Sequence, residues 1–242
     1  MNATELTAAS AENIRLARIL DADIAALPAL TQLTVVEREG LRHAVTDGLL
    51  ANHRRLLGLL ADASALVPIG LIVKISKDIF GPRLSALVSG FLSPNRAASL
   101  IGKIPLDLLV EQTPHLDERI VPTLVEKVDV SVHRALCAAL AKDRDYATLV
   151  AVLCAVPTTM LAVTLSDLAD SDVLAVAAVA VSPHDRTRIL ESRLDAAGGP
   201  QPRCSDPATV ADAATRLVSA LPGLDIETAG AAINALLVPA TN

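Results

Sequence analysis

The 242-residue chain is poor in aromatic side chains and in cysteine. It has no Trp, one Tyr and two Phe, while apolar residues make up 52% of the sequence. With so few rings, its core must be built from Leu, Val, Ile and Ala. Three cysteines are an odd number, which does not fit a framework of paired disulfides. Cys137 and Cys154 lie in apolar stretches and are predicted to be buried, reduced thiols, whereas Cys204 lies in a polar loop.

The chain also lacks the short motifs that mark common active sites. It contains no glycine-rich phosphate loop, no G-x-S-x-G, no Cys-x-x-Cys and no H-E-x-x-H. We therefore expect no cofactor and a protein that is not an enzyme, although an active site of an unfamiliar type stays open. The net charge of −6 argues against general binding of nucleic acid.

Two kinds of targeting segment are missing as well. The opening residues, MNATELTAASAENIR, have no basic start and no apolar run of a signal sequence. Ala147 to Leu165 carries no charge over 19 positions, which approaches the length of a membrane span. Pro157 divides this run, so the sequence predicts two buried helices that meet at the proline. We expect a cytoplasmic protein, with peripheral attachment to a membrane as the alternative.

Signals for helix starts are abundant. Between Pro105 and Leu194, apolar residues recur at spacings near three and four, and the predicted helices open with residues such as Asp117, Asp129, Pro157 or Ser182. Residues 173–181, VLAVAAVAV, are rich in Ala and predict a buried helix instead of a strand. Helices of about 10 residues are marginal alone, so each must stack on its neighbours. The sequence predicts an all-α protein, either a short-helix α-solenoid or a compact superhelical bundle.

We divide the chain into four parts. The first is an N-terminal helical pair, whose second helix runs from about Thr31 to Asp62 with a break near Gly40 or Gly48. The whole division is residues 1–63 for this pair, residues 64–194 for the short-helix array, residues 195–206 for a loop, and residues 207–242 for a C-terminal helical pair.

Two turn sequences in the array carry a resemblance to a known family. Pro105–Leu109 reads P-L-D-L-L and Leu116–Arg119 reads L-D-E-R. With the surrounding short helices, residues 93–194 resemble the N-terminal superhelical domain of MgtE-type magnesium transporters and the helical domains of flagellar motor switch proteins. The resemblance implies a superhelical array. Nothing after the array resembles a nucleotide-sensing module or a multi-span pore, so neither ion transport nor any functional residue is carried over.

Residues 64–104 differ from the rest of the chain in charge. They hold five cations against Asp78 alone, a net charge of +4, and both phenylalanines. Apolar anchors interleaved with cations suit an acidic protein partner or an anionic membrane surface. The simpler alternative is a set of core helices whose charges point outward. The predicted contact surface consists of Lys74, Lys77, Phe80, Arg83, Phe91 and Arg96.

Glu39, His43 and Asp47 follow one another at i, i+4 spacing and share one face of a helix. Carboxylates and an imidazole on one face can supply some of the ligands of a metal site, but a metal also needs a ligand from another element. The sequence shows no such ligand, so we predict a solvated helix face and no metal.

Other polar groups receive structural interpretations. His133 and Cys137 are also at i, i+4 spacing, and a Cys–His dyad is a known nucleophile. Cys137 is flanked by Leu and Ala, however, which predicts a buried structural thiol. His115 and His184 sit beside prolines and are expected to serve turns or helix caps.

These observations predict a non-catalytic intracellular adaptor or scaffold that binds a protein partner through its helical array. The alternative is a carrier of an apolar small molecule or lipid. For this alternative, the charge-free stretches Ala147–Val156 and Val173–Val181 would line the cavity.

Overall fold

The computed structural model describes residues 7–196, and all its regular elements there are helices. This confirms the all-α prediction for the described part of the chain; the predicted C-terminal pair 207–242, nearly all of the loop 195–206 and Cys204 lie outside it. The helices are α1 Ala8–Leu20, η2 Ile24–Ala26, η3 Pro28–Gln32, α2 Val35–Ala65, α3 Ile69–Ile75, η4 Ser76–Phe80, α4 Gly81–Ser89, α5 Pro94–Ile101, α6 Leu106–Gln112, η5 Thr113–His115, α7 Val121–Val125, α8 Val130–Lys142, α9 Tyr146–Ala155, α10 Thr158–Leu165, α11 Asp170–Val179 and α12 Pro183–Ala196.

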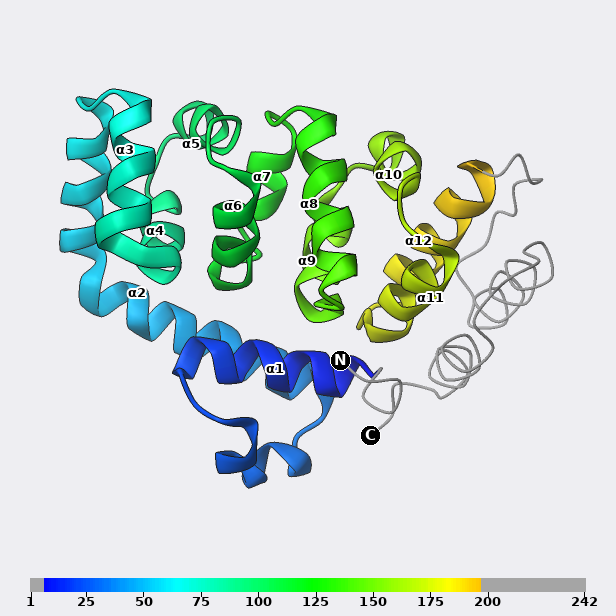
Figure 1. Cartoon of the computed structure of the whole chain (residues 1–242). Helices are drawn as coiled ribbons and strands as arrows, with labels where there is room; N and C mark the ends of the chain where they lie inside the picture. The colour runs from blue at the N-terminus through cyan, green and yellow to red at the C-terminus, as the bar shows by residue number, and fades with distance from the viewer. Residues whose placement is uncertain (1–6, 197–242) are drawn as a thin grey trace.

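The helices from α3 to α12 pack in two rows. Within a row, each helix contacts the helix two places further along the chain. α4, α6, α8, α10 and α12 form one row, and α3, α5, α7, α9 and α11 form the other. The rows are joined where α8 packs on α9 and α11 packs on α12. Figure 1 shows the helices following one another across the molecule in chain order. Each short helix is thus stabilised by neighbours on several sides.

The first two helices lie against these rows. α1 packs on α2, α9 and α11, and α2 packs on α4 as well as on α1. In Figure 1, α1 and the first half of α2 run below the two rows, and the second half of α2 rises at the end next to α3. Thr34 and Glu37 start α2 with a capping box, in which each side chain accepts from the other residue's backbone N–H. α2 has no break at Gly40 or Gly48.

The main core is aliphatic, as the composition predicts. It is centred on helices α8 to α12, where Leu149, Leu153, Leu161, Leu174 and Ile189 are all fully buried. A smaller cluster joins α2 to α4 through Leu57, Ala61 and Val88. α9 and α11 bury residues all round, which explains why their sequences carry almost no charge.

Several of the predicted helix starts are confirmed. Asp129 caps α8 by accepting from the Ser131 N–H, and Pro157 separates α9 from α10 as predicted. The segment from Asp117 differs, because the helix begins only at Val121. Asp117 accepts from the backbone N–H of Arg119 at 3.0 Å and holds a turn, and α7 follows with Pro122 in its first turn. This turn carries Glu118.

Candidate functional site

A polar network joins α1, α2 and the turn before α7. Arg42 on α2 donates from Nε to Glu12 Oε2 on α1 at 2.7 Å, and from Nη2 to Glu118 Oε1. Arg15, one turn after Glu12, donates to Glu12 Oε1 and reaches Glu118 Oε2 at 3.4 Å. Its Nε also donates to the carbonyl oxygen of Ala147 on α9 at 2.8 Å. The network therefore ties the N-terminal helices to the rows.

These charges are withdrawn from water to different degrees. Glu12 is only 1% exposed and Arg42 is 4% exposed, while Glu118 is half-buried. Burial raises the pKa of Glu118, but the charges of Arg15 and Arg42 and hydrogen bonds from Arg42 and His43 outweigh it and hold the pKa below its usual value. Burial likewise lowers the pKa of Arg42, and its two carboxylate partners raise it above the usual value. Both shifts favour the charged forms.

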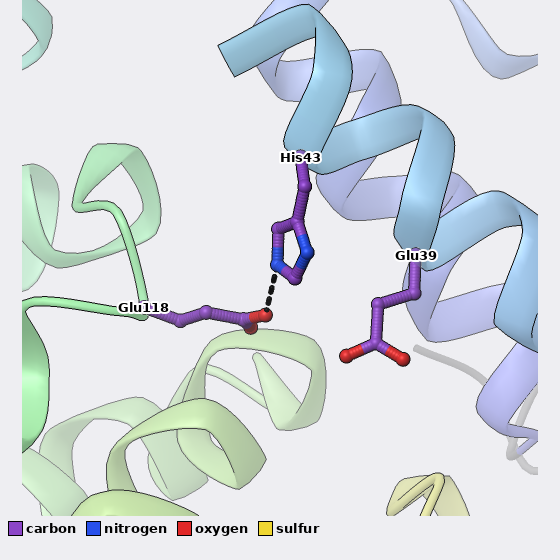
Figure 2. Close-up of side chains that lie close together, drawn as sticks. All are labelled: Glu39, His43 and Glu118. Carbon is purple, nitrogen blue, oxygen red and sulfur yellow. Dashed lines mark hydrogen bonds and ion pairs between the residues drawn. The ribbon is translucent and has the colours of Figure 1, made fainter. Parts of the chain in front are cut away.

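His43 and Glu39 extend the network on the same face of α2. His43 Nε2 lies 2.9 Å from Glu118 Oε1, the same oxygen that Arg42 contacts. One ligand atom from each of Glu39, His43 and Glu118 lies within 4.8 Å of the other two. Figure 2 shows the His43 ring pointing at the Glu118 carboxylate, with the Glu39 carboxylate on the same side of the helix. The second element that the sequence did not reveal is therefore the turn at Glu118.

Asp47, the third member of the predicted helix face, is not part of this cluster. Its Oδ1 accepts from Arg119 Nη2 at 2.7 Å, and Arg119 also binds Asp117. The hydrogen bond from Arg119 holds the pKa of Asp47 below its usual value. Asp47 thus holds the turn at residues 117–119 through Arg119. Glu118, in the same turn, contacts Arg15, Arg42 and His43 instead.

A pocket of about 260 Å³ opens beside the cluster. Its polar lining comes from Arg15, Glu39, Glu118, Ser182 and Asp185. Its apolar lining includes residues from the two stretches predicted to line a ligand cavity, namely Val150 and Ala151 of the first and Val179 and Val181 of the second. The pocket consequently places carboxylates next to an aliphatic wall.

The two described cysteines are free thiols. Cys137 has no exposed surface, and burial raises its pKa to about 12. His133 Nε2 lies 3.1 Å from the carbonyl oxygen of Val125, so the imidazole has a backbone partner instead of the thiol. The prediction of a buried structural Cys137 is confirmed. Cys154, which was also predicted to be buried, is only partly buried because it lines the pocket. Burial and the charge of Asp185 raise its pKa to about 12.

The predicted contact residues fall into two groups. Lys74 and Lys77 are exposed on α3 and η4. Arg83 and Arg96 instead hold the protein together: Arg83 donates to the carbonyl oxygen of Ile19 at 2.6 Å, and Arg96 donates to those of Ser64 and Val67, at the end of α2 and just beyond it.

Both phenylalanines are partly buried. Phe91 packs against the cluster that joins α2 to α4. Phe80 lines a cavity of about 60 Å³, whose walls come largely from α3 to α6. Gln112 lines the same cavity, and its buried side-chain nitrogen has no hydrogen-bond partner.

None of the helices that the structure describes is both long and apolar enough to cross a membrane. Comparison with protein-family models, with curated proteins and with solved structures finds no match for this chain.

Proposed function

We propose that this chain is a non-catalytic, intracellular adaptor that binds an acidic, amphipathic segment of a protein partner at the α2–α3 end of its helical rows. The observation that carries the proposal is a group of exposed apolar side chains at this end, interspersed with cations. The free Cys137 and Cys154 support a reducing compartment.

The second half of α2 presents an apolar stripe on its outer side. Leu56, Leu59 and Leu66 are 56%, 59% and 88% exposed. Their spacing places them on one face of the helix or its immediate continuation, whereas Leu57 and Ala61 point the other way and are buried in the cluster with α4. An amphipathic helix of a partner, laid along such a stripe, would remove these side chains from water.

The next segment adds more apolar surface and charge. Leu71 is 49% exposed and Ile79 is 73% exposed, with the exposed Lys74 and Lys77 between them. Gly81 has a φ of +69°, a conformation that favours glycine, and turns the chain from η4 into α4. This turn leaves Ile79 on the outside.

Charge selects the kind of partner. Residues 54–80 contain four cations (Arg54, Arg55, Lys74 and Lys77), all exposed, and two acids (Asp62 and Asp78), a net charge of +2 in a chain of net charge −6. An acidic segment is attracted to this end and repelled by the remainder of the molecule. The resemblance of residues 93–194 to superhelical array domains agrees with a role in assembly and adds no transport function.

The test compares a charge-reversed surface with a matched control. Lys74→Glu/Lys77→Glu changes the proposed surface, and Lys127→Glu/Lys142→Glu makes the same change of charge at exposed positions elsewhere. Proteins captured from lysate by each form are quantified by mass spectrometry and then cross-linked. We expect a partner that is lost only from the first variant and whose acidic segment cross-links to residues 54–80.

A captured set that is identical for all three proteins overturns the proposal. Sedimentation with phosphatidylserine vesicles separates the membrane alternative. Binding to vesicles that the first variant loses, without a protein partner, means that the same surface contacts an anionic membrane instead.

A second candidate function, binding of a small apolar molecule, is favoured by the 60 Å³ cavity and the unpaired amide nitrogen of Gln112. A ligand that fits there is aliphatic with one hydrogen-bond acceptor. Native mass spectrometry of the purified chain tests this directly, because a bound molecule adds a defined mass that Gln112→Leu removes.

A further inference from the structure

The cluster of Glu39, His43 and Glu118 lies beside the first half of α2, away from the stripe at Leu56–Leu66. We propose that these three side chains form a binding site for one divalent transition-metal ion, of which Zn²⁺ is the most suitable probe. This inference does not depend on the proposed adaptor function.

The geometry provides ligands from two separate elements. Glu39 and His43 are one turn apart on α2, and Glu118 comes from the turn before α7 (Figure 2). His43 Nε2 and Glu118 Oε1 are 2.9 Å apart. With metal–ligand distances of about 2.1 Å, two ligands of a tetrahedral Zn²⁺ ion are about 3.4 Å apart, about 0.5 Å more than in the hydrogen bond. An ion therefore replaces this hydrogen bond after a small side-chain movement, once the neutral imidazole carries its proton on Nδ1, and Glu39 closes the third position.

Among the paired groups of the network and Glu39, carboxylates outnumber guanidinium groups. Three carboxylates, those of Glu12, Glu39 and Glu118, face two guanidinium groups, those of Arg15 and Arg42. Within residues 7–196, no hydrogen bond or ion pair engages Glu39. The two arginines weaken the attraction for a cation, but they also hold Glu118 in place, as partners of metal ligands commonly do.

The ligand types select the class of metal. Imidazole together with carboxylate suits Zn²⁺ and similar first-row ions, whereas Mg²⁺ prefers oxygen ligands and retains its waters. The adjoining 260 Å³ pocket is lined by Glu39 and Glu118, so water can complete the coordination from that side. Asp185 lines the same pocket but is paired with Arg188 at 3.3 Å. We therefore do not count it as a fourth ligand of the ion.

Isothermal titration of the full, tag-free chain with Zn²⁺ tests the site, and Co²⁺ absorption reports the coordination. We expect one ion per chain, with affinity reduced at least about tenfold in His43→Gln and in Glu39→Gln. His53→Gln is the matched control, since His53 is an exposed histidine of the same helix. Asp47→Asn should leave the affinity for Zn²⁺ unchanged, because Asp47 is paired with Arg119 and lies outside the cluster.

Three results would overturn the proposal. These are the absence of Zn²⁺ binding to the wild-type chain, binding that His43→Gln leaves unchanged, and an equal loss in His53→Gln, which would indicate adventitious surface binding. Far-UV circular dichroism establishes that each variant is folded. Because Glu39→Gln changes no side-chain size at a half-exposed position, it keeps the test decisive if His43→Gln alters the fold.

Discussion

The buried ion-pair network can be tested by removing the charge of Glu12. In Glu12→Gln the side chain keeps its size and one acceptor oxygen, but Arg15 and Arg42 lose one of their two carboxylates. The amide nitrogen of Gln replaces one of the two Glu12 oxygens and therefore faces the N–H donor of Arg15 or of Arg42, to which it cannot bond. The variant therefore leaves Arg15 and Arg42 to share the single carboxylate of Glu118, in a place where Arg42 is only 4% exposed.

The magnitude follows from the burial of these groups. A pair of unit charges about 4 Å apart attracts by about 4 kcal/mol at an effective dielectric constant of about 20. Desolvation cancels much of that attraction while the pair is intact, but breaking a buried pair costs about 3–5 kcal/mol, because one charge stays buried without compensation. For a chain of this size, the melting temperature should fall by about 6–20 °C.

Urea unfolding followed by far-UV circular dichroism measures the change in the free energy of unfolding. Asp47→Asn is the control, because it removes one carboxylate charge from the exposed pair with Arg119 and should leave the midpoint nearly unchanged. Glu12→Gln combined with Arg42→Gln should be less destabilised than the sum of the two single variants. If Glu12→Gln shifts the midpoint no more than Asp47→Asn does, the network does not stabilise the fold and the reasoning is refuted.

Four further predictions follow from the same structure. Cys137 and Cys154 should react slowly with a thiol reagent in the native state, since burial raises the pKa of each to about 12, and Cys204 is predicted to react first; fast native labelling of Cys137 would contradict this. Leu109→Ala, Leu124→Ala and Leu149→Ala should each lower the free energy of unfolding by about 2–5 kcal/mol, and unchanged urea midpoints would show that these core faces are wrong. Because the folded pKa of Glu118 is lowered, its carboxylate stabilises the fold above the unfolded pKa of about 4.3, and this stability is lost as pH falls through the folded pKa; Glu118→Gln should flatten the decline of stability below about pH 5, and an unchanged acid limb would count against it. Gly48→Ala should raise the melting temperature, because a Cβ there meets nothing within 4 Å and Ala favours the helix by about 1 kcal/mol; a lower melting temperature would reveal a constraint on that position.

Helix boundaries were predictable wherever the signal was local. A proline or an Asp at the start of a helix acts within four residues, so Pro157 and Asp129, which are the N-cap residues of α10 and α8, mark helix starts in the sequence as well as in the structure. The segment after Asp117 was predicted less well. Its carboxylate caps a turn instead of α7, and an Asx-turn and an N-cap have the same sequence signal.

The candidate site was only half predictable. Glu39 and His43 share a helix face by spacing alone, but Glu118 lies 75 residues beyond His43 and becomes a neighbour only in the fold, where the turn before α7 lies against α1 and α2. Charged residues are seldom buried unless they are paired. From the sequence alone, Glu12 and Arg42 would therefore be expected on a solvent-exposed helix face. Their pairing across 30 residues depends on the packing of α1 on α2, which no local pattern encodes.

The continuity of α2 shows how tertiary contacts override a local signal. Gly40, Gly48 and Gly58 each disfavour a helix by about 1 kcal/mol relative to Ala, and none of them is required by close packing. The helix persists because its first half is held by the pairs of Arg42 and its second half by the packing of Leu57 on α4. α2 thereby joins the proposed metal-ligand cluster to the exposed stripe in one continuous helix. If a metal ion at Glu39 and His43 orders the first half of α2, it should also reduce fraying at Leu56–Leu66, which hydrogen exchange with and without Zn²⁺ can measure.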